Sequence, residues 1–493
     1  MDNKNFNSSS LNELSIYELR NLGRQMGVYS PTIYKKQELI NQIVLIVNGD
    51  AEPYIRKNKQ GRPPKSLIDA NKILEVLVRK DINLNTELEY NSNLEYKRHN
   101  VANKNSNFDH ISKKDNSNDD NMETVSGIVE IYNNNFGFLH NDFMKTLSNG
   151  IYISNKHIEE YHLKSGDVVT AKINSGLKEI SNAVCEVLTV NGKPPLTDIR
   201  INFEDMNAIY PGAKIKLETE EQITGKVIDL FTPICFGQRV LVSSSEQLGS
   251  YDILGSIANL VEKNNKKAKV IYFAVDNAPE YIAELKKNTH IEVFALEFSL
   301  SFEVRIRTAN LVLEYVKRQV ENGEQVILFI DGVEKMIEAY ANFYSSTDET
   351  NVQSGNMTSY NVSANSFIKS VYSLKRMFAT GRNTKEGGSV TIFASLLTDE
   401  SVNEDKTIRK ELKSIANALL VLSKNMQYIK LIPPINIMES YSESLERCIS
   451  SRHIECVQSI REKCTEQNYI EYIKTVFANL LNCKTTEEFC QKY

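Results

Sequence analysis

The residues that could do chemistry begin at a polar loop near position 245. An apolar segment at 240–242 leads into the polar run 243–247, and a helical pattern follows over 252–260. A loop in this order binds phosphates through backbone N–H groups, a Lys that reaches the β- and γ-phosphates, and a Ser or Thr hydroxyl that holds Mg²⁺. The order therefore indicates nucleoside triphosphate chemistry, provided that these side chains are present.

The loop lacks the side chains that this chemistry requires. Gly249 fits the last glycine of the motif, but Ser250 then stands at the Lys position and Tyr251 at the hydroxyl position. Glu246 would add negative charge beside a bound triphosphate. We interpret the loop as a degenerate nucleotide site, made of Gln247, Gly249, Ser250 and Tyr251.

The composition is that of a globular protein and not of a polycation. The chain has 493 residues, enough for two to four domains, and 41% of them are hydrophobic. Its net charge is −5, so a nucleic-acid site would be a local patch. No apolar run approaches the roughly 20 residues of a membrane helix, and the polar N-terminus predicts no signal peptide. We expect a cytoplasmic protein without a membrane contact.

The seven cysteines are interpreted as buried thiols. They stand at positions 185, 235, 448, 456, 464, 483 and 490, with no Cys-x-x-Cys motif and no His pair at ligand spacing. This pattern favours free thiols in a reducing compartment over a disulfide or a metal site. We therefore expect no metal ligands among them.

The first 123 residues predict a helical unit and a linker. Residues 1–50 contain helical patterns at 16–26 and at 35–47, the second with apolar residues recurring at three and four. Residues 51–123 predict a linker that is partly disordered, because its second half is polar and has too few apolar groups for a core. The basic segment 57–65 is either a nucleic-acid contact or solvated linker, and the single copy of its motif favours linker.

Residues 124–190 predict a five-stranded barrel of the oligonucleotide-binding (OB) type. Short runs with alternating apolar and polar residues are separated by turns. These runs lie at 125–132, 136–139, 150–153, 168–173 and 183–187. Residues 191–222 are then expected to form a connector.

Residues 223–493 predict an α/β domain. Strand patterns lie at 240–242, 269–276, 326–331, 389–394 and 418–422. Amphipathic helices are expected between them, for example over 307–322. This alternation is typical of a parallel sheet that is covered by helices on both faces.

Five segments resemble the bacterial transcription termination factor Rho family. They are 203–219, 227–241, 326–332, 375–383 and 386–394, in the order and near-constant spacing of that family. The resemblance implies an N-terminal helical subdomain, an OB-fold or cold-shock-like barrel and a C-terminal RecA-like ATPase domain. It also implies a hexameric ring that uses ATP and Mg²⁺ to move along RNA.

The resemblance implies an RNA site on the barrel. Phe136 and Phe138 match the aromatic pair of the family and share one face of a strand, where bases can stack. Tyr152 matches a further contact residue, and His140 stands where the family has Arg. Glu186 replaces a Lys, which weakens phosphate binding. The alternative is that the Phe pair is the core of a small barrel, and the surrounding match favours RNA binding.

The resemblance also predicts that the motor has lost its catalytic groups. Asp331 matches the metal-binding carboxylate, although an Asp that ends a buried strand can equally be structural. Asn277 stands at the position of the catalytic Glu, and an amide cannot accept a proton from water. Glu439 and Glu443 fall where the family has Arg, which reverses the charge that stabilises the transition state. We predict no catalytic residue, no bound metal and no nucleotide cofactor.

These observations together predict a Rho-like protein that binds single-stranded RNA without ATPase activity and regulates Rho-dependent termination. The expected partners are RNA and either an active Rho or the RNA polymerase complex, in a homo- or hetero-oligomeric ring. Two alternatives stay open. One is an active RNA-dependent ATPase with a divergent nucleotide site, and the other is a scaffold that binds neither RNA nor nucleotide.

Overall fold

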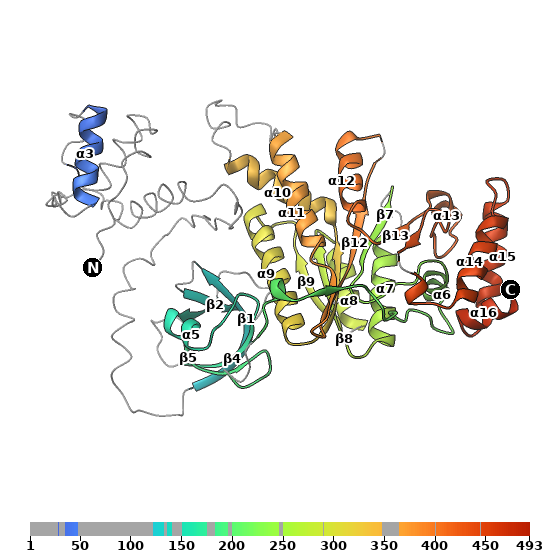
Figure 1. Cartoon of the computed structure of the whole chain (residues 1–493), viewed down its shortest axis with the longest axis horizontal. Helices are drawn as coiled ribbons and strands as arrows, with labels where there is room; N and C mark the ends of the chain where they lie inside the picture. The colour runs from blue at the N-terminus through green and yellow to red at the C-terminus, as the bar shows by residue number, and fades with distance from the viewer. Residues whose placement is uncertain are drawn as a thin grey trace. The chain divides into compact units, whose positions relative to one another are not determined.

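The computed structural model describes the chain as two units, residues 1–93 and 94–493 (Figure 1). The described residues are 28, 35–47, 122–132, 136–140, 150–174, 183–195, 200–245, 250–288, 290–347, 364–399, 401–443 and 445–493. In the first unit, helix α3 (Lys36–Val47) agrees with the second predicted helix. The predicted helix at 16–26 and nearly all of the predicted linker lie outside the described residues.

The second unit begins with an antiparallel sheet whose order is β3-β2-β1-β4-β5. Its strands are β1 (Met122–Tyr132), β2 (Phe136–His140), β3 (Ile151–Ser154), β4 (Val168–Asn174) and β5 (Val184–Val190). Helix α5 (Asn155–Glu160) follows β3 and is capped by the hydroxyl of Ser154. A parallel bridge from Tyr152 to Ala183 brings β3 next to the start of β5. The sheet therefore curls into an open half-barrel of the predicted OB type.

Alternation along these strands fills the inside of the barrel. Val129, Leu139, Ile151 and Val169 are buried in one apolar cluster, and their neighbours along each strand face outward. The five predicted strands are confirmed, with ends that shift by a few residues.

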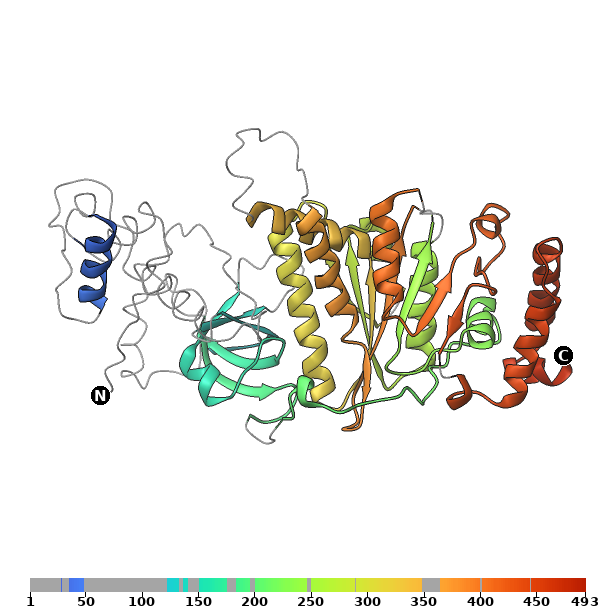
Figure 2. The ribbon, with the colours of Figure 1, turned by 45° about the horizontal axis from the view of Figure 1, so that its top comes forward.

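The remainder of the unit is built on a mostly parallel sheet whose order is β14-β13-β7-β12-β10-β8-β9 (Figure 2). The main strands are β7 (Arg239–Ser244), β8 (Ala268–Val275), β9 (Glu292–Leu296), β10 (Gln325–Asp331), β12 (Ser389–Leu397) and β13 (Ala418–Val421). Strand β14 (Tyr441–Ser442) pairs antiparallel to β13. The short strands β6 (Ala208–Ile209) and β11 (Arg382–Thr384) pair antiparallel beside β12. Five of the six main strands were predicted from sequence, whereas β9 and the short strands β6, β11 and β14 were not.

Helices cover both faces of this sheet, as predicted. One face packs on helices α6 (Ile223–Phe231), α7 (Ser250–Asn264), α8 (Pro279–Asn288), α14 (Ser451–Lys463), α15 (Tyr469–Leu481) and α16 (Thr486–Lys492). The other face packs on α9 (Phe302–Glu321), α10 (Val333–Thr347), α11 (Ala364–Phe378) and α12 (Asn403–Lys413). The short helix α13 (Lys424–Tyr428) follows β13. The carboxyl ends of the parallel strands meet at one edge, where open α/β sheets bind their ligands.

The cysteines differ from the prediction. Cys235 and Cys448 form a disulfide, and Cys185 is exposed. The two bonded residues are 213 positions apart in sequence, and the contact between Gln238 and Ser442 (3.0 Å) places their segments side by side. The spacing of the cysteines along the sequence does not predict a disulfide between residues this far apart. The buried free thiols are Cys456, Cys483 and Cys490.

Candidate functional site

Strands β1, β2 and β3 carry a cluster of four aromatic rings. Phe138 lies opposite Tyr152 in the β2–β3 register, and Phe136 lies opposite Tyr132 in the β1–β2 register. The Phe136 and Phe138 rings are 5.9 Å apart and edge to face, while Phe136 stacks on Tyr132 at 5.6 Å. Tyr152 completes the cluster, 6.4 Å from Phe136. Three residues predicted to contact RNA, Phe136, Phe138 and Tyr152, therefore form one continuous aromatic surface together with Tyr132.

This surface lies on the face of the barrel that is opposite to its core. Gly137 and Leu139 are buried, whereas Phe136 and Phe138, which alternate with them along β2, are only half-buried. None of the four rings belongs to the apolar cluster that fills the described part of the barrel. Gly137 is required between the Phe residues, since a Cβ there would lie 2.8 Å from the Glu130 carbonyl oxygen. Half-buried rings on an outward face are available for base stacking.

His140 lies inside the protein and not on this aromatic surface. Its side chain is 3% exposed, and its Nε2 atom lies 2.9 Å from a Glu130 carboxylate oxygen. Arg307 of α9 donates two hydrogen bonds to the same carboxylate, both of 2.5 Å, and its guanidinium lies 5.1 Å from the Tyr132 ring centre. Burial alone would raise the pKa of Glu130, but hydrogen bonds from His140 and Arg307 hold that pKa below its usual value. The aromatic surface is thereby anchored to a helix of the α/β domain.

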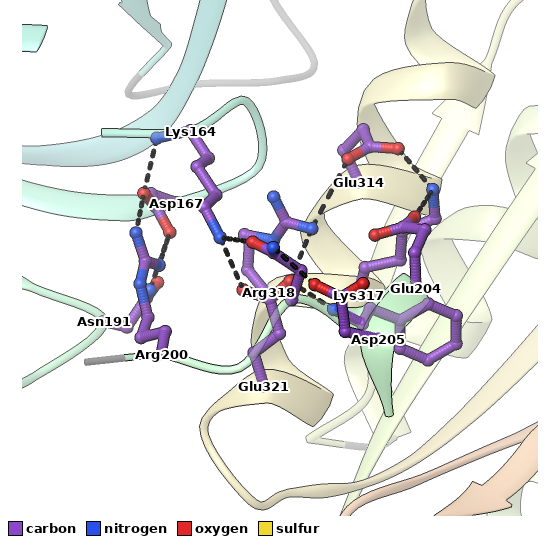
Figure 3. A network of polar contacts seen from close by, with 12 residues as sticks. Lys164, Asp167, Asn191, Arg200, Glu204, Asp205, Glu314, Lys317, Arg318 and Glu321 are labelled. Carbon is purple, nitrogen blue, oxygen red and sulfur yellow. Dashed lines mark hydrogen bonds and ion pairs between the residues drawn. The ribbon is translucent and has the colours of Figure 1, made fainter. Parts of the chain in front are cut away.

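A second set of ion pairs joins the barrel to the same helix (Figure 3). Glu321 has a fully buried side chain, receives a hydrogen bond from Arg318 at 2.7 Å, and lies 3.7 Å from the Lys164 ammonium group. Its other contact is the backbone N–H of Phe203, at 2.8 Å. At the rim, Lys317 pairs with Glu204 at 2.8 Å. These pairs connect residues of the barrel, the connector and α9.

Of the predicted nucleotide loop, the structure describes only the helical end. Gln247 and Gly249 lie outside the described residues. Ser250 and Tyr251 begin α7, and the placement of their side chains is also outside the description. The geometry of the site is therefore built from the neighbouring strand ends.

Asp331 ends β10 and is completely enclosed by hydrogen-bond donors. One carboxylate oxygen accepts from the Ser395 hydroxyl at 2.7 Å. The other accepts from the Tyr272 hydroxyl at 2.7 Å and from the Asn277 amide at 2.8 Å. Burial raises the pKa of Asp331, and the three hydrogen bonds oppose that rise. The Asn277 side chain therefore contacts Asp331, and both residues belong to the degenerate nucleotide site predicted from the sequence.

Tyr281 extends this network toward α7. Its hydroxyl lies 3.0 Å from the Tyr272 hydroxyl, and a Cβ on Gly255 would come within 2.4 Å of it. A side chain larger than Gly at position 255 would displace Tyr281. The network therefore links α7, β8, β10 and α8 through two phenols and one carboxylate.

The residues around Asp331 do not fit a Mg²⁺ ion held by that carboxylate. Magnesium requires oxygen ligands with free lone pairs and usually keeps several waters. Asp331 is 0% exposed, and both of its oxygens accept hydrogen bonds from protein side chains. Within the described residues, no group of three or more His, Cys, Asp or Glu could hold a metal ion. Glu439, which stands at one of the two positions where the family has Arg, lies at the surface and accepts a hydrogen bond from Asn436 at 2.5 Å.

Glu334 is a second acidic group close to Asp331. Burial, together with the negative charge of Asp331, raises the pKa of Glu334 to about 7. Its carboxylate accepts a hydrogen bond of 3.4 Å from the Leu397 backbone at the end of β12. A carboxyl group in this position is half-protonated near neutral pH.

Sequence reasoning missed three residues that shape these sites. Tyr272 was part of a predicted strand core, and its hydroxyl had no visible partner because Asp331 is 59 positions away. Arg307 was placed only in an amphipathic helix. Tyr132 had a detectable signal, since it faces the same side as the Phe pair once β1 and β2 are paired.

Comparisons with known proteins agree with this architecture. Residues 125–196 match the family described as Rho termination factor, RNA-binding domain. Residues 225–442 match the ATP synthase alpha/beta family, nucleotide-binding domain. Among the helices of the described residues, none has the length and apolar character needed to cross a membrane.

Relatives of the chain are named transcription termination factor Rho. The protein from Streptobacillus moniliformis is 30% identical over 354 residues, which cover 71% of this chain and 81% of the relative. The proteins from Borreliella burgdorferi and Bacillus subtilis are 29% and 28% identical, over 74% and 76% of this chain and 70% and 86% of the relatives. The chain combines an OB-type barrel with a RecA-like α/β domain. It belongs to the transcription termination factor Rho family.

Proposed function

We propose that this Rho-family protein binds single-stranded RNA on its barrel but does not hydrolyse ATP, and that it regulates Rho-dependent termination. The observation that carries the proposal is the closed network around Asp331. In a phosphoryl-transfer motor the corresponding carboxylate must hold the metal ion. In this protein the Asp331 carboxylate instead accepts hydrogen bonds from Ser395, Tyr272 and Asn277.

The loss of a water-activating group supports the same conclusion. Asn277 is 8% exposed and donates its amide hydrogen to Asp331. The neutral amide of Asn277 cannot accept a proton from water, and its N–H group already donates a hydrogen bond to Asp331. Ser250 and Tyr251 supply neither the Lys nor the small hydroxyl of a working loop.

RNA binding is proposed for the aromatic surface made of Tyr132, Phe136, Phe138 and Tyr152. Each base that stacks on such a ring contributes about 1–3 kcal/mol and requires no particular sequence. His140 is left out of the binding surface, since Glu130 holds it in the interior. The role of His140 is then to link β2 to β1 through its contact with Glu130.

The RNA proposal is tested with the full chain and a short pyrimidine oligonucleotide. Replacing both Phe residues, F136A/F138A, is expected to cost about 2–6 kcal/mol in binding if both rings stack independently. The control is F298A, which removes a ring that is 63% exposed and belongs to the loop between β9 and α9. Unchanged affinity in the double variant would contradict stacking at this surface.

The regulatory part is tested by mixing the chain with an active Rho from the same cell. A protein that occupies RNA, or joins the ring without hydrolysis, is expected to lower the RNA-stimulated ATPase activity of that Rho in proportion to its concentration. Unchanged activity at a large excess of this chain would contradict a regulatory role.

A further inference from the structure

We propose that Cys456 and Cys490 are a redox-sensitive thiol pair, which a hydroperoxide oxidises to a disulfide between α14 and α16. Helix α16 packs beside α14 and α15 (Figure 1). Cys456 lies in the middle of α14, and Cys490 lies in the last turn of α16. The proposal concerns these helices alone and does not depend on RNA binding at the barrel.

The two cysteines meet at the interface between their helices. Cys456 is 7% exposed and Cys490 is 6% exposed, and both belong to the same apolar cluster. The Arg452 guanidinium, one turn before Cys456 on α14, donates a hydrogen bond of 3.2 Å to the backbone carbonyl of Cys490. The two thiols are also hydrogen-bonded to each other. Sulfur atoms in such contact need only small side-chain rotations to reach the disulfide bond length of about 2.05 Å.

The hydrogen bond between the thiols makes them chemically unequal. The bond from Cys490, together with the positive charge of Arg452, lowers the pKa of Cys456, although burial opposes this effect. The same hydrogen bond, together with burial, raises the pKa of Cys490. Because the thiolate is the nucleophile in thiol chemistry, Cys456 is the attacking sulfur and Cys490 is the resolving sulfur.

The reaction balances with hydrogen peroxide as the oxidant. The Cys456 thiolate attacks one peroxide oxygen, the O–O bond breaks, and the leaving hydroxide takes up a proton to become water. The Cys490 sulfur then attacks the sulfur of the Cys456 sulfenic acid, the S–O bond breaks, and the OH group leaves with the Cys490 proton as a second water. Two thiols thus lose two electrons, which reduce one peroxide to two waters. Hydrogen peroxide is also small enough for thiols that are less than a tenth exposed.

The disulfide would add a covalent link to a short helix. Helix α16 has seven residues, and Thr486 at its start donates to Glu218 from its backbone N–H and its hydroxyl, at 2.9 and 3.0 Å. A short helix that is held by packing and hydrogen bonds opens locally at a lower cost than the core of the sheet. The two cysteines are 34 positions apart, and a cross-link over a loop of this length restricts the unfolded chain. Oxidation should therefore fasten α16 to α14.

The site is tested with the full chain, purified without reductant so that the bond between Cys235 and Cys448 stays intact. The protein is treated with a small molar excess of hydrogen peroxide, the remaining thiols are blocked under denaturing conditions, and the peptides are mapped by mass spectrometry. We expect a cross-linked peptide that contains Cys456 and Cys490 and is reversed by dithiothreitol. The oxidised protein should also melt about 5 °C higher and exchange the amide hydrogens of α16 more slowly.

Three variants assign the roles of the two sulfurs. In C490S, the sulfenic acid of Cys456 has no resolving thiol and should be captured by dimedone. In C456S, Cys490 should stay unmodified. The control C483S removes a thiol that is also 6% exposed, and it should form the cross-link as fast as the parent protein.

Several outcomes would overturn the proposal. One is recovery of both thiols unmodified from the treated parent protein, a result that needs no substitution and so does not depend on the folding of a variant. Another is a cross-link from either cysteine to Cys464 or Cys483. Dimedone capture at Cys490 in C456S, as fast as at Cys456 in C490S, would contradict the assigned attacking sulfur. A cross-link that changes neither the melting temperature nor the hydrogen exchange of α16 would contradict the fastening of the helix.

Discussion

Replacing Tyr272 with Phe tests whether the Asp331 network is a structural element. The substitution keeps the ring, which is 0% exposed, and removes the hydroxyl that donates to the carboxylate at 2.7 Å. Hydrogen bonds to charged groups contribute about 1.5–3 kcal/mol, so we expect a destabilisation of about 2 kcal/mol. For a domain of this size that is a fall of about 4–8 °C in melting temperature.

The loss is expected to depend on pH in a defined direction. The Tyr272 hydrogen bond lowers the pKa of Asp331 against the effect of burial, so its removal raises that pKa further. The ionised form of Asp331 loses more stabilisation than the protonated form when the Tyr272 donor is removed. Y272F should therefore be more destabilised at pH 8 than at pH 5.

Tyr315 provides a matched control for this substitution. It is 2% exposed and also donates to a carboxylate, Glu292, at 2.6 Å. The Glu292 side chain is 46% exposed, so water can replace the lost donor. Y315F is expected to lose less than about 1 kcal/mol. Equal melting temperatures for Y272F and the parent protein, or equal losses in Y272F and Y315F, would refute the argument from enclosure.

Three further substitutions probe the other acidic groups and the loop. The pKa of Glu334 is raised from 4.5 to about 7, so its stabilising contribution is complete below pH 4.5 and is lost as the pH rises through 7. By chemical unfolding, E334Q should therefore be as stable as the parent protein at pH 4.5 and about 2–3 kcal/mol more stable at pH 8. E321A leaves the buried Arg318 with only the more distant carboxylate of Glu314, at 3.7 Å, and should cost about 3 kcal/mol. E204A, at a 61% exposed carboxylate, should cost less than about 1 kcal/mol, and equal melting temperatures for the two variants would contradict this. S250K/Y251T should show a nucleotide-dependent rise in melting temperature but no ATP hydrolysis, because Asn277 still donates to Asp331 and cannot act as the catalytic base. RNA-stimulated hydrolysis by this variant would show that another residue is the catalytic base.

The alternation of strands and helices could be predicted from local patterns. Strands such as β10 read as continuous apolar runs, because both faces of a parallel sheet are buried. Strand β9 escaped prediction because its five residues include exposed Glu292 and follow a short helix. The aromatic pair of β2 was also visible, since positions two apart share a strand face.

The contacts that decide function could not be predicted in the same way. Asp331 and Asn277 could be paired by resemblance, but the donor Tyr272 entered the site only through the register of β8 beside β10. The environment of His140 likewise depends on Arg307, which is 167 positions away on another element. Long-range contacts of this kind leave no periodic signal in the sequence.

The most direct test of the proposed function is ATP hydrolysis by the purified full chain, with RNA binding measured in the same sample. We expect no hydrolysis above background when polycytidine RNA is saturating, because Asp331 is enclosed and Asn277 replaces the base. RNA-stimulated turnover of about one per second, within the usual range of phosphoryl-transfer enzymes, would contradict the proposal and show that this protein is an active RNA-dependent ATPase.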